Sequence, residues 1–311
     1  MQRMPKEMKK LLILLLSLMM VISCARKEAG SEDSFTVVAI DFPSYDAARF
    51  LLGDDDKLVM LLRPGVEMHS YDPTPKDMIE IADADLVVFA GGPSDEWVYR
   101  ILESTENASY FTLLSAVKPL FEEHVEGMEA DSDEEDEIDE HVWTSPINEI
   151  AILKALSEKL CEMTGKSIYE ERFEEIAGKL EALDNEFRQI VEDADINTLL
   201  FASRFPLRYF TEEYGLDYYA AFPGCAEESE PSAKTVAFLI DKARELNVPC
   251  ILNIELSSSL IANTIADEAG CKVKVFQSIH NVTPEDYRSG ADYLTLMERN
   301  KEVLREALNA Y

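Results

Sequence analysis

The chain has 311 residues, of which 61 are acidic, 29 are basic and four are histidines, and its formal net charge is −32 at pH 7. A surface this acidic repels nucleic acid and anionic lipid and attracts cations. We therefore expect no nucleic-acid partner. Much of the charge can serve solubility alone. The length is sufficient for two modest domains.

Residues 1–23 are predicted to form an export signal. A basic start precedes an apolar run over residues 11–21, which is too short for a membrane span. The run ends in Val21-Ile22-Ser23-Cys24, which resembles the lipobox of bacterial lipoproteins, in which cleavage leaves Cys24 as the lipidated first residue. We therefore expect residues 24–34 to be a polar tether and the protein to be membrane-anchored, at a Gram-positive surface or in a periplasm. The alternative is an ordinary signal peptide with an incidental cysteine.

After the tether, apolar runs alternate with helical patterns. Strands are expected at Phe35–Ile40, Lys57–Arg63, Asp85–Ala90 and Tyr110–Leu114. Helices are expected to begin near Ser44, Thr74 and Ser94, because Ser and Thr cap the free N–H groups of a first helical turn. Fully apolar strands alternating with helices indicate a parallel sheet covered on both faces.

Residues 122–140 interrupt this pattern. Thirteen of these nineteen residues are Asp, Glu or His, and such a segment has too little apolar surface to fold, so we expect a mobile loop. The loop, which includes His124, either collects cations weakly or is a solvated insertion. It ends at His141, and Ser145-Pro146 then predicts a helix that runs to Gly165.

The longest helical signal is Ser167–Ala194, whose apolar residues recur every three or four positions. Further strands are expected at Thr198–Ala202, Asp217–Ala221, Cys250–Glu255 and Lys272–Gln277. Helices are expected at Phe205–Tyr214, Ser232–Asn247, Ser258–Ala269 and Asp292–Asn309. The predicted fold is therefore two α/β lobes with parallel sheets, residues 35–166 and 196–311, joined by one long rigid helix at residues 167–195.

Three of the four histidines follow predicted strands. His69 and His141 each lie on a strand-to-helix loop of the first lobe, and His280 follows the last strand of the second. Ligands of open parallel sheets bind outside the carboxyl ends of the strands, so the three histidines can meet in a cleft between the lobes. Imidazole suits zinc, and three histidines with one further ligand form a known zinc arrangement. Any one of them alone would more simply be an exposed or capping residue.

Five motifs resemble those of one known family, and they are Arg63–Pro75, His141–Pro146, Tyr209–Gly215, Glu228–Pro231 and Tyr293–Asn300. The family is the solute-binding proteins of zinc- and manganese-type ABC importers, and the resemblance runs from about residue 35 to the C-terminus. The resemblance implies two lobes holding one divalent metal, metal-binding roles for His69 and His141, and delivery of the metal to a membrane permease. It also implies a monomer that is not an enzyme.

Two positions depart from the family pattern. The third family ligand, His or Glu, is replaced by Arg204, and the fourth, usually Asp, is matched by His280. Arginine stays protonated and cannot bind a metal, so we expect Arg204 to pair with Glu228 or Glu255, or to steer an anion or water to the metal. Replacement ligands to consider are Cys225 and Glu255.

The predicted metal set is therefore His69, His141 and His280, with zinc favoured over manganese because manganese prefers oxygen ligands. Two other classes remain open: a zinc hydrolase with an activated water, and a surface adhesin. No HExxH-like pair adjoins the histidines. The cysteines beyond Cys24 contain no CxxC pair, which argues against a thiolate zinc cluster and leaves any disulfide pairing open.

Overall fold

The structure is a computed structural model that describes residues 34–66, 68, 71–105, 109–129, 137–226 and 230–309. The predicted signal peptide, Cys24 and nearly all of the tether lie outside the described residues, as does His69. What is predicted for these segments stays a prediction from sequence.

The first lobe is built on one parallel sheet with strand order β2-β1-β3-β4. Its strands are β1 (Thr36–Ala39), β2 (Lys57–Met60), β3 (Leu86–Phe89) and β4 (Ser109–Thr112). Its helices are α2 (Phe42–Leu51), α3 (Pro75–Ala82) and α4 (Glu96–Glu103). The four residues of β3 are fully buried, whereas β2 lies at the edge and is only partly covered, so the expectation of a buried second strand is wrong there.

The helix starts of this lobe agree only in part with the expected caps. Thr74 caps α3 as predicted, and its side chain accepts the N–H of Asp77. The cap of α2 is Asp41, which accepts the N–H of Ser44 at 2.8 Å, so that helix begins before Ser44. Ser94 does not cap α4, because it lies inside a short 3-10 turn that precedes the helix.

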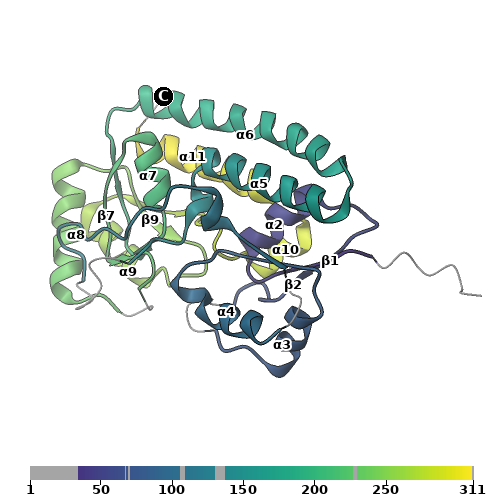
Figure 1. The fold of residues 1–311 in the computed structure, drawn as a ribbon. Helices are drawn as coiled ribbons and strands as arrows, with labels where there is room; N and C mark the ends of the chain where they lie inside the picture. Colours follow the sequence, from purple (N-terminus) through teal and green to yellow (C-terminus); the bar gives the residue numbers. More distant parts are fainter. Residues whose placement is uncertain are drawn as a thin grey trace, which may run out of the picture. The chain divides into compact units, whose positions relative to one another are not determined.

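The long predicted helix is present as α6 (Ile168–Glu192), which Figure 1 shows running beside α5 (Pro146–Thr164) and α11 (Tyr293–Ala307). α5 ends at Gly165 as expected, where a φ of 72° suits glycine. The buried residues of the α6 stripe include Phe173, Ile176, Leu180, Leu183, Phe187 and Ile190. Since these residues recur at helical spacing, α6 packs along one continuous apolar face.

The second lobe repeats the strand order of the first. Its main strands are β5 (Thr198–Leu200), β7 (Asp217–Tyr219), β9 (Cys250–Ile254) and β10 (Lys272–Phe276), paired as β5-β7 and β9-β10, all parallel. A parallel bridge between Phe201 and Leu252, with the Ala202 N–H bonded to the Leu252 carbonyl at 2.9 Å, joins the two pairs. The resulting order, β7-β5-β9-β10, corresponds strand for strand to β2-β1-β3-β4.

The remaining elements of this lobe are short strands and flanking helices. The strands β6 (Arg204–Phe205) and β8 (Phe222–Pro223) pair in parallel beyond β5 and β7. The helices are α7 (Arg208–Tyr214), α8 (Ala233–Leu246), α9 (Leu260–Ala269) and α10 (Pro284–Ser289). Because residues 204–205 are strand, α7 begins three residues later than predicted.

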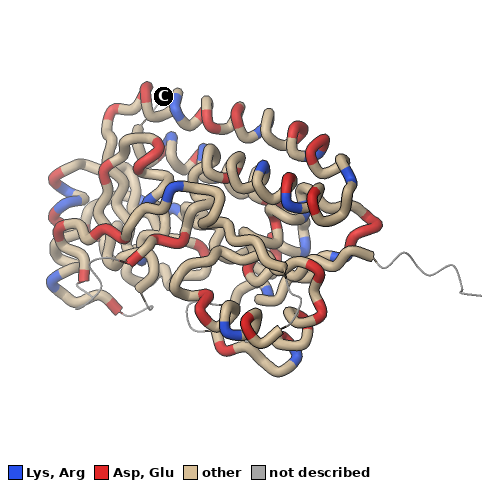
Figure 2. Tube along the Cα trace, viewed as in Figure 1, with Lys and Arg blue, Asp and Glu red and all other residues tan. Residues whose placement is uncertain are grey.

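The prediction of two parallel-sheet α/β lobes and one long connecting helix is confirmed by these elements and by the structural neighbours reported below. The exact domain boundaries stay a prediction. Acidic residues are distributed over many elements rather than gathered on one (Figure 2). Within the described residues, no helix combines the length and apolar character that crossing a bilayer requires.

Candidate metal centre

His141 lies on a short loop that ends in a 3-10 turn (η3, Val142–Thr144) directly before α5. Its side chain is fully buried. Asp139 Oδ1 accepts the backbone N–H of His141 at 2.8 Å and lies 3.0 Å from its Nδ1. A carboxylate at Nδ1 fixes the proton there and leaves Nε2 as the atom suited to a metal.

The charges around His141 favour a cation. Burial alone would lower the pKa of the imidazole, but the charge and hydrogen bond of Asp139, together with Glu140 and Glu122, outweigh burial and raise it. Burial likewise raises the pKa of the Glu140 carboxyl, although the nearby imidazole opposes this. Both groups therefore hold protons more readily than usual, and a divalent ion would replace those protons with its own positive charge.

His280 meets His141 from the second lobe. The two rings lie 5.0 Å apart, centroid to centroid, at 90°, and both rings contact Trp143. Trp143 Nε1 donates to the Ser278 carbonyl at 2.9 Å, which ties the His141 loop to the His280 loop. Ile279, just before His280, has a φ of 61°, a conformation that β-branched residues rarely adopt and that occurs most often at functional sites.

The end of the acidic segment is part of this centre, so the expectation of a mobile loop is wrong for residues 139 and 140, whereas residues 130–136 lie outside the described residues. Asp139 and Glu140 are fully buried, and Glu140 Oε2 accepts the N–H of Ser94 at 3.2 Å. Glu140 also packs against Gly92, and a side chain at position 92 would collide with the Glu140 side chain. Composition averaged over residues 122–140 concealed these contacts, because it does not distinguish the residues that pack against the lobes from the rest of the segment.

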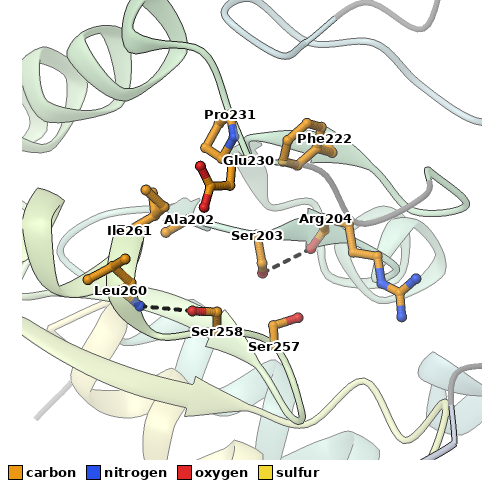
Figure 3. A pocket seen from close by; sticks show the side chains of 10 residues that line it. All are labelled: Ala202, Ser203, Arg204, Phe222, Glu230, Pro231, Ser257, Ser258, Leu260 and Ile261. Atoms are coloured by element: carbon orange, nitrogen blue, oxygen red, sulfur yellow. Dashed lines mark hydrogen bonds between the residues drawn. The ribbon is translucent and has the colours of Figure 1, made fainter.

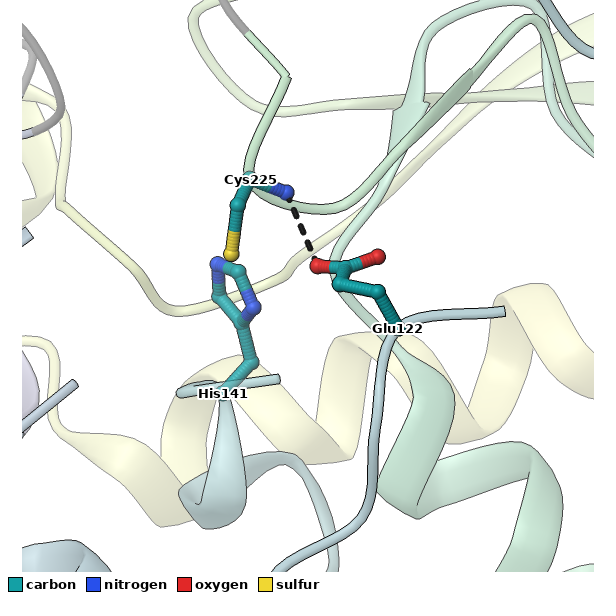
Figure 4. Close-up of side chains that lie close together, drawn as sticks. All are labelled: Glu122, His141 and Cys225. Atoms are coloured by element: carbon teal, nitrogen blue, oxygen red, sulfur yellow. Dashed lines mark hydrogen bonds between the residues drawn. The ribbon is translucent and has the colours of Figure 1, made fainter. Parts of the chain in front are cut away.

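Two groups of side chains have the spacing of metal ligands, and both include His141. The ligand atoms of Glu140, His141 and His280 all lie within 4.8 Å of one another, and so do those of Glu122, His141 and Cys225. Figure 4 shows the second group, with the sulfur of Cys225 beside a ring nitrogen of His141. Sequence reasoning missed Glu122 and Glu140 and named Cys225 only as an alternative, because nothing in the sequence marks one carboxylate of an acidic run as buried.

Arg204 is buried and lies between two cavities. One cavity, of about 120 Å³, also borders His280, Glu255 and Met68. The other, of about 200 Å³, borders Ser203 and Glu230, and in Figure 3 the Arg204 guanidinium points away from it. The first cavity is therefore the one that joins Arg204 to the candidate centre.

Glu255 is engaged with the His280 loop and is a poor candidate ligand. Its two carboxylate oxygens accept the N–H of Ser278 at 2.6 Å and the Ser278 hydroxyl at 2.7 Å. Burial raises the pKa of Glu255, and the positive charge of Arg204 opposes that rise. This agrees with the expected attraction between Arg204 and Glu255; the other expected partner, Glu228, lies outside the described residues.

The chain on the N-terminal side of His69 also reaches the His280 loop. Asn281 accepts the N–H of Gly65 at 3.2 Å and donates to the carbonyl of Val66. Met68 borders the same cavity as His280. These contacts bring the described part of the predicted Arg63–Pro75 motif to the second lobe.

The two α/β lobes, the long connecting helix and the buried histidine–carboxylate cluster are typical of a two-lobed protein of the solute-binding class. The family model described as "Zinc-uptake complex component A periplasmic" (ZnuA) matches residues 37–307. Since the match covers most of the sequence, the chain belongs to the ZnuA family.

Named relatives agree with this assignment. The zinc-binding lipoprotein AdcA of Streptococcus pneumoniae is 27% identical over 308 residues, which cover 96% of this chain but only 61% of AdcA. The high-affinity zinc uptake system protein ZnuA of Bacillus subtilis is 28% identical over 316 residues, which cover 97% of this chain and 98% of that protein. This chain therefore spans less than two thirds of the length of AdcA and nearly the whole of B. subtilis ZnuA.

Solved structures show the same fold. The Zn(II)-bound ZnuA-like domain of S. pneumoniae AdcA superposes with a TM-score of 0.75 at 25% identity, covering 89% of this chain and 99% of that domain. The metal-dependent lipoprotein YcdH of B. subtilis superposes with a TM-score of 0.75 at 28% identity, covering 88% of this chain and 100% of that one.

Proposed function

We propose that this protein is a receptor that captures a divalent metal ion, zinc in preference to manganese, between its two lobes and delivers it to an ABC importer. The observation that supports this most directly is the group of Glu140, His141 and His280, whose ligand atoms lie within 4.8 Å of one another in a buried site. Buried carboxylates and imidazoles so close together are stabilised by a cation that all of them can bind. The metal is cargo, and no chemical step is proposed.

The choice of zinc rests on the ligand chemistry and on the relatives. Imidazole nitrogens suit zinc, whereas manganese prefers oxygen ligands. The relatives AdcA and ZnuA are named for zinc, and a neighbouring structure holds Zn(II). The proposed ligands are His141 and His280, together with His69 from the Arg63–Pro75 motif.

The cellular setting is proposed from the sequence and the family. Cys24 would carry a lipid that anchors the receptor outside the cell membrane, and residues 24–34 would tether the lobes to that anchor. The family model names a periplasmic component of a zinc-uptake complex, which supports an extracytoplasmic address and a membrane permease as partner. We propose that the receptor acts as a monomer.

The test is metal binding by wild-type protein and by single histidine variants. Protein purified without chelator should contain about one zinc per chain, and competition with a chromophoric chelator should show tighter binding of zinc than of manganese. Loss of a residue that only orients a metal ligand typically weakens metal binding by roughly 10- to 100-fold. His141→Ala and His280→Ala each remove a proposed ligand and should therefore weaken zinc binding by more than that. His124→Ala is the matched control, because His124 is exposed, and should leave the affinity unchanged.

Two results would contradict the proposal. Tighter binding of manganese than of zinc would overturn the choice of metal. Unchanged zinc affinity in His141→Ala and His280→Ala would place the site elsewhere in the chain.

A further inference from the structure

The site proposed above has one unexplained feature, which is the arginine at a position where the family supplies a ligand. The guanidinium of Arg204 cannot bind a metal, because it stays protonated. A closed zinc site has four protein ligands. An open site has three protein ligands, and a water molecule takes the fourth position. The three histidines proposed above would make an open site, and a closed site requires a fourth protein donor.

Cys225 lies where such a donor would be required. It follows the short strand β8 (Phe222–Pro223), and its sulfur, a ring nitrogen of His141 and a carboxylate oxygen of Glu122 lie within 4.8 Å of one another (Figure 4). Bond lengths of about 2.3 Å to sulfur and 2.0–2.1 Å to nitrogen place tetrahedral zinc ligands about 3.3–3.6 Å apart. The sulfur and the imidazole nitrogen would therefore need to approach each other by at most about 1.5 Å to bind one ion.

The loop that carries Cys225 is held in this position by Glu122. Its carboxylate accepts the N–H groups of Gly224 at 3.1 Å and of Cys225 at 3.0 Å. A side chain at position 224 would lie 3.0 Å from both the Glu122 carboxylate and the Phe205 carbonyl, so the loop approaches its neighbours as closely as glycine permits. The position of the sulfur is therefore defined by packing and hydrogen bonds on both sides.

A second observation indicates that the surroundings of these ligand atoms favour a positive charge. Asp139 is fully buried, and its Oδ2 accepts no hydrogen bond from the residues that the structure describes. Its other oxygen bonds to His141 Nδ1, so the unbonded oxygen lies in the immediate surroundings of the proposed ligands. A buried carboxylate oxygen without a donor is costly, and a nearby divalent ion offsets that cost.

We propose that the thiolate of Cys225 is, with His141, a ligand of the bound metal and supplies a donor that Arg204 cannot supply. The inference rests on the metal-receptor function proposed above and identifies a ligand within that site. On binding, the thiol loses its proton to solvent and the sulfur forms a bond to the metal, with no change in oxidation state. A thiolate makes the site softer and favours zinc over manganese more strongly than imidazoles alone.

The test uses the full chain loaded with Co(II) in place of zinc. One thiolate ligand should give a thiolate-to-cobalt charge-transfer absorption in the near ultraviolet. Cys225→Ser should abolish this band and weaken zinc binding by roughly 10- to 100-fold or more. Cys271→Ser is the matched control and should keep the band. Cys271 is a free, partly buried cysteine directly before β10, whereas His280 follows the opposite end of that strand.

X-ray absorption of zinc-loaded wild-type protein gives the same answer without a variant that could fail to fold. It should show one sulfur at about 2.3 Å in addition to nitrogen neighbours. Tight metal binding with only nitrogen and oxygen neighbours, or a cobalt band that persists in Cys225→Ser, would overturn the role of Cys225 and leave the receptor function intact. The absence of any tight zinc or cobalt binding by wild-type protein would instead overturn the receptor function itself.

Discussion

The contact between Trp143 and the His280 loop leads to a quantitative prediction. Trp143 is fully buried, and its Nε1 donates to the Ser278 carbonyl at 2.9 Å. Trp143→Phe keeps an aromatic ring in the site but removes this donor. Losing one partner of a buried hydrogen bond costs about 1–3 kcal/mol, so the free energy of unfolding should fall by that amount. The smaller ring also leaves a void, which adds to the loss.

The chain provides a control for the ring size. Trp97 is the second of the two tryptophans, and its Nε1 is buried but has no hydrogen-bond partner among the described residues. Trp97→Phe shortens the ring without breaking a bond, at a side chain that is only partly buried. Urea unfolding followed by far-ultraviolet circular dichroism should give a lower midpoint for Trp143→Phe than for Trp97→Phe, with similar slopes. Equal destabilisation by the two variants would refute the role assigned to the Trp143 hydrogen bond.

Three further predictions concern single positions. Asp139→Asn should weaken zinc binding about 10- to 100-fold in a chelator competition, because the carboxylate orients His141; an unchanged affinity would show that it does not. Burial raises the pKa of Asp46 from 3.8 to about 6. As the pH rises through this range, the Asp46 carboxyl loses its proton in the unfolded chain before it does so in the folded protein. The free energy of unfolding therefore falls, by about 3 kcal/mol in total. Asp46→Asn should remove that part of the decrease between about pH 4 and pH 7 in urea unfolding, and a variant with the wild-type pH dependence would contradict the assignment. Leu256 has a φ of 64° and is half exposed, so Leu256→Asn should raise the free energy of unfolding by about 1 kcal/mol; destabilisation would argue against backbone strain at this position.

The features that sequence predicts well are those that repeat along the chain. The stripe of α6 identifies the longest helix because six apolar residues recur at a single period and all are buried. The buried strand β3 follows from a run of consecutive apolar residues. His280 could be predicted to face His141 because each follows the last strand of its own lobe's parallel sheet, and the structure places the two rings 5.0 Å apart.

What the sequence does not predict depends on tertiary contacts. Residues 139 and 140 belong to a run that composition classifies as solvated, yet both are buried because the chain passes against Gly92 and the Ser94 N–H. Similarly, the cap of α2 is Asp41 and not Ser44, since both residues can cap and only the packed backbone selects one. Cys225 has no sequence motif, and its proximity to His141 arises from a loop that Glu122 holds from a position more than a hundred residues away.

The repeated strand order explains why a ligand at Cys225 would be consistent with the architecture. In the first lobe, His69 follows the second strand along the chain, β2, and His141 follows the fourth, β4. In the second lobe, Cys225 follows β7 and its short extension β8, which are the counterparts of β2, and His280 follows β10, the counterpart of β4. Arg204 instead follows β5, the counterpart of the central strand β1. A set made of His69, His141, Cys225 and His280 would therefore draw one ligand from each of four strand ends, which form the two equivalent pairs β2/β7 and β4/β10. Replacing a ligand by Arg204 would then leave the metal with four donors.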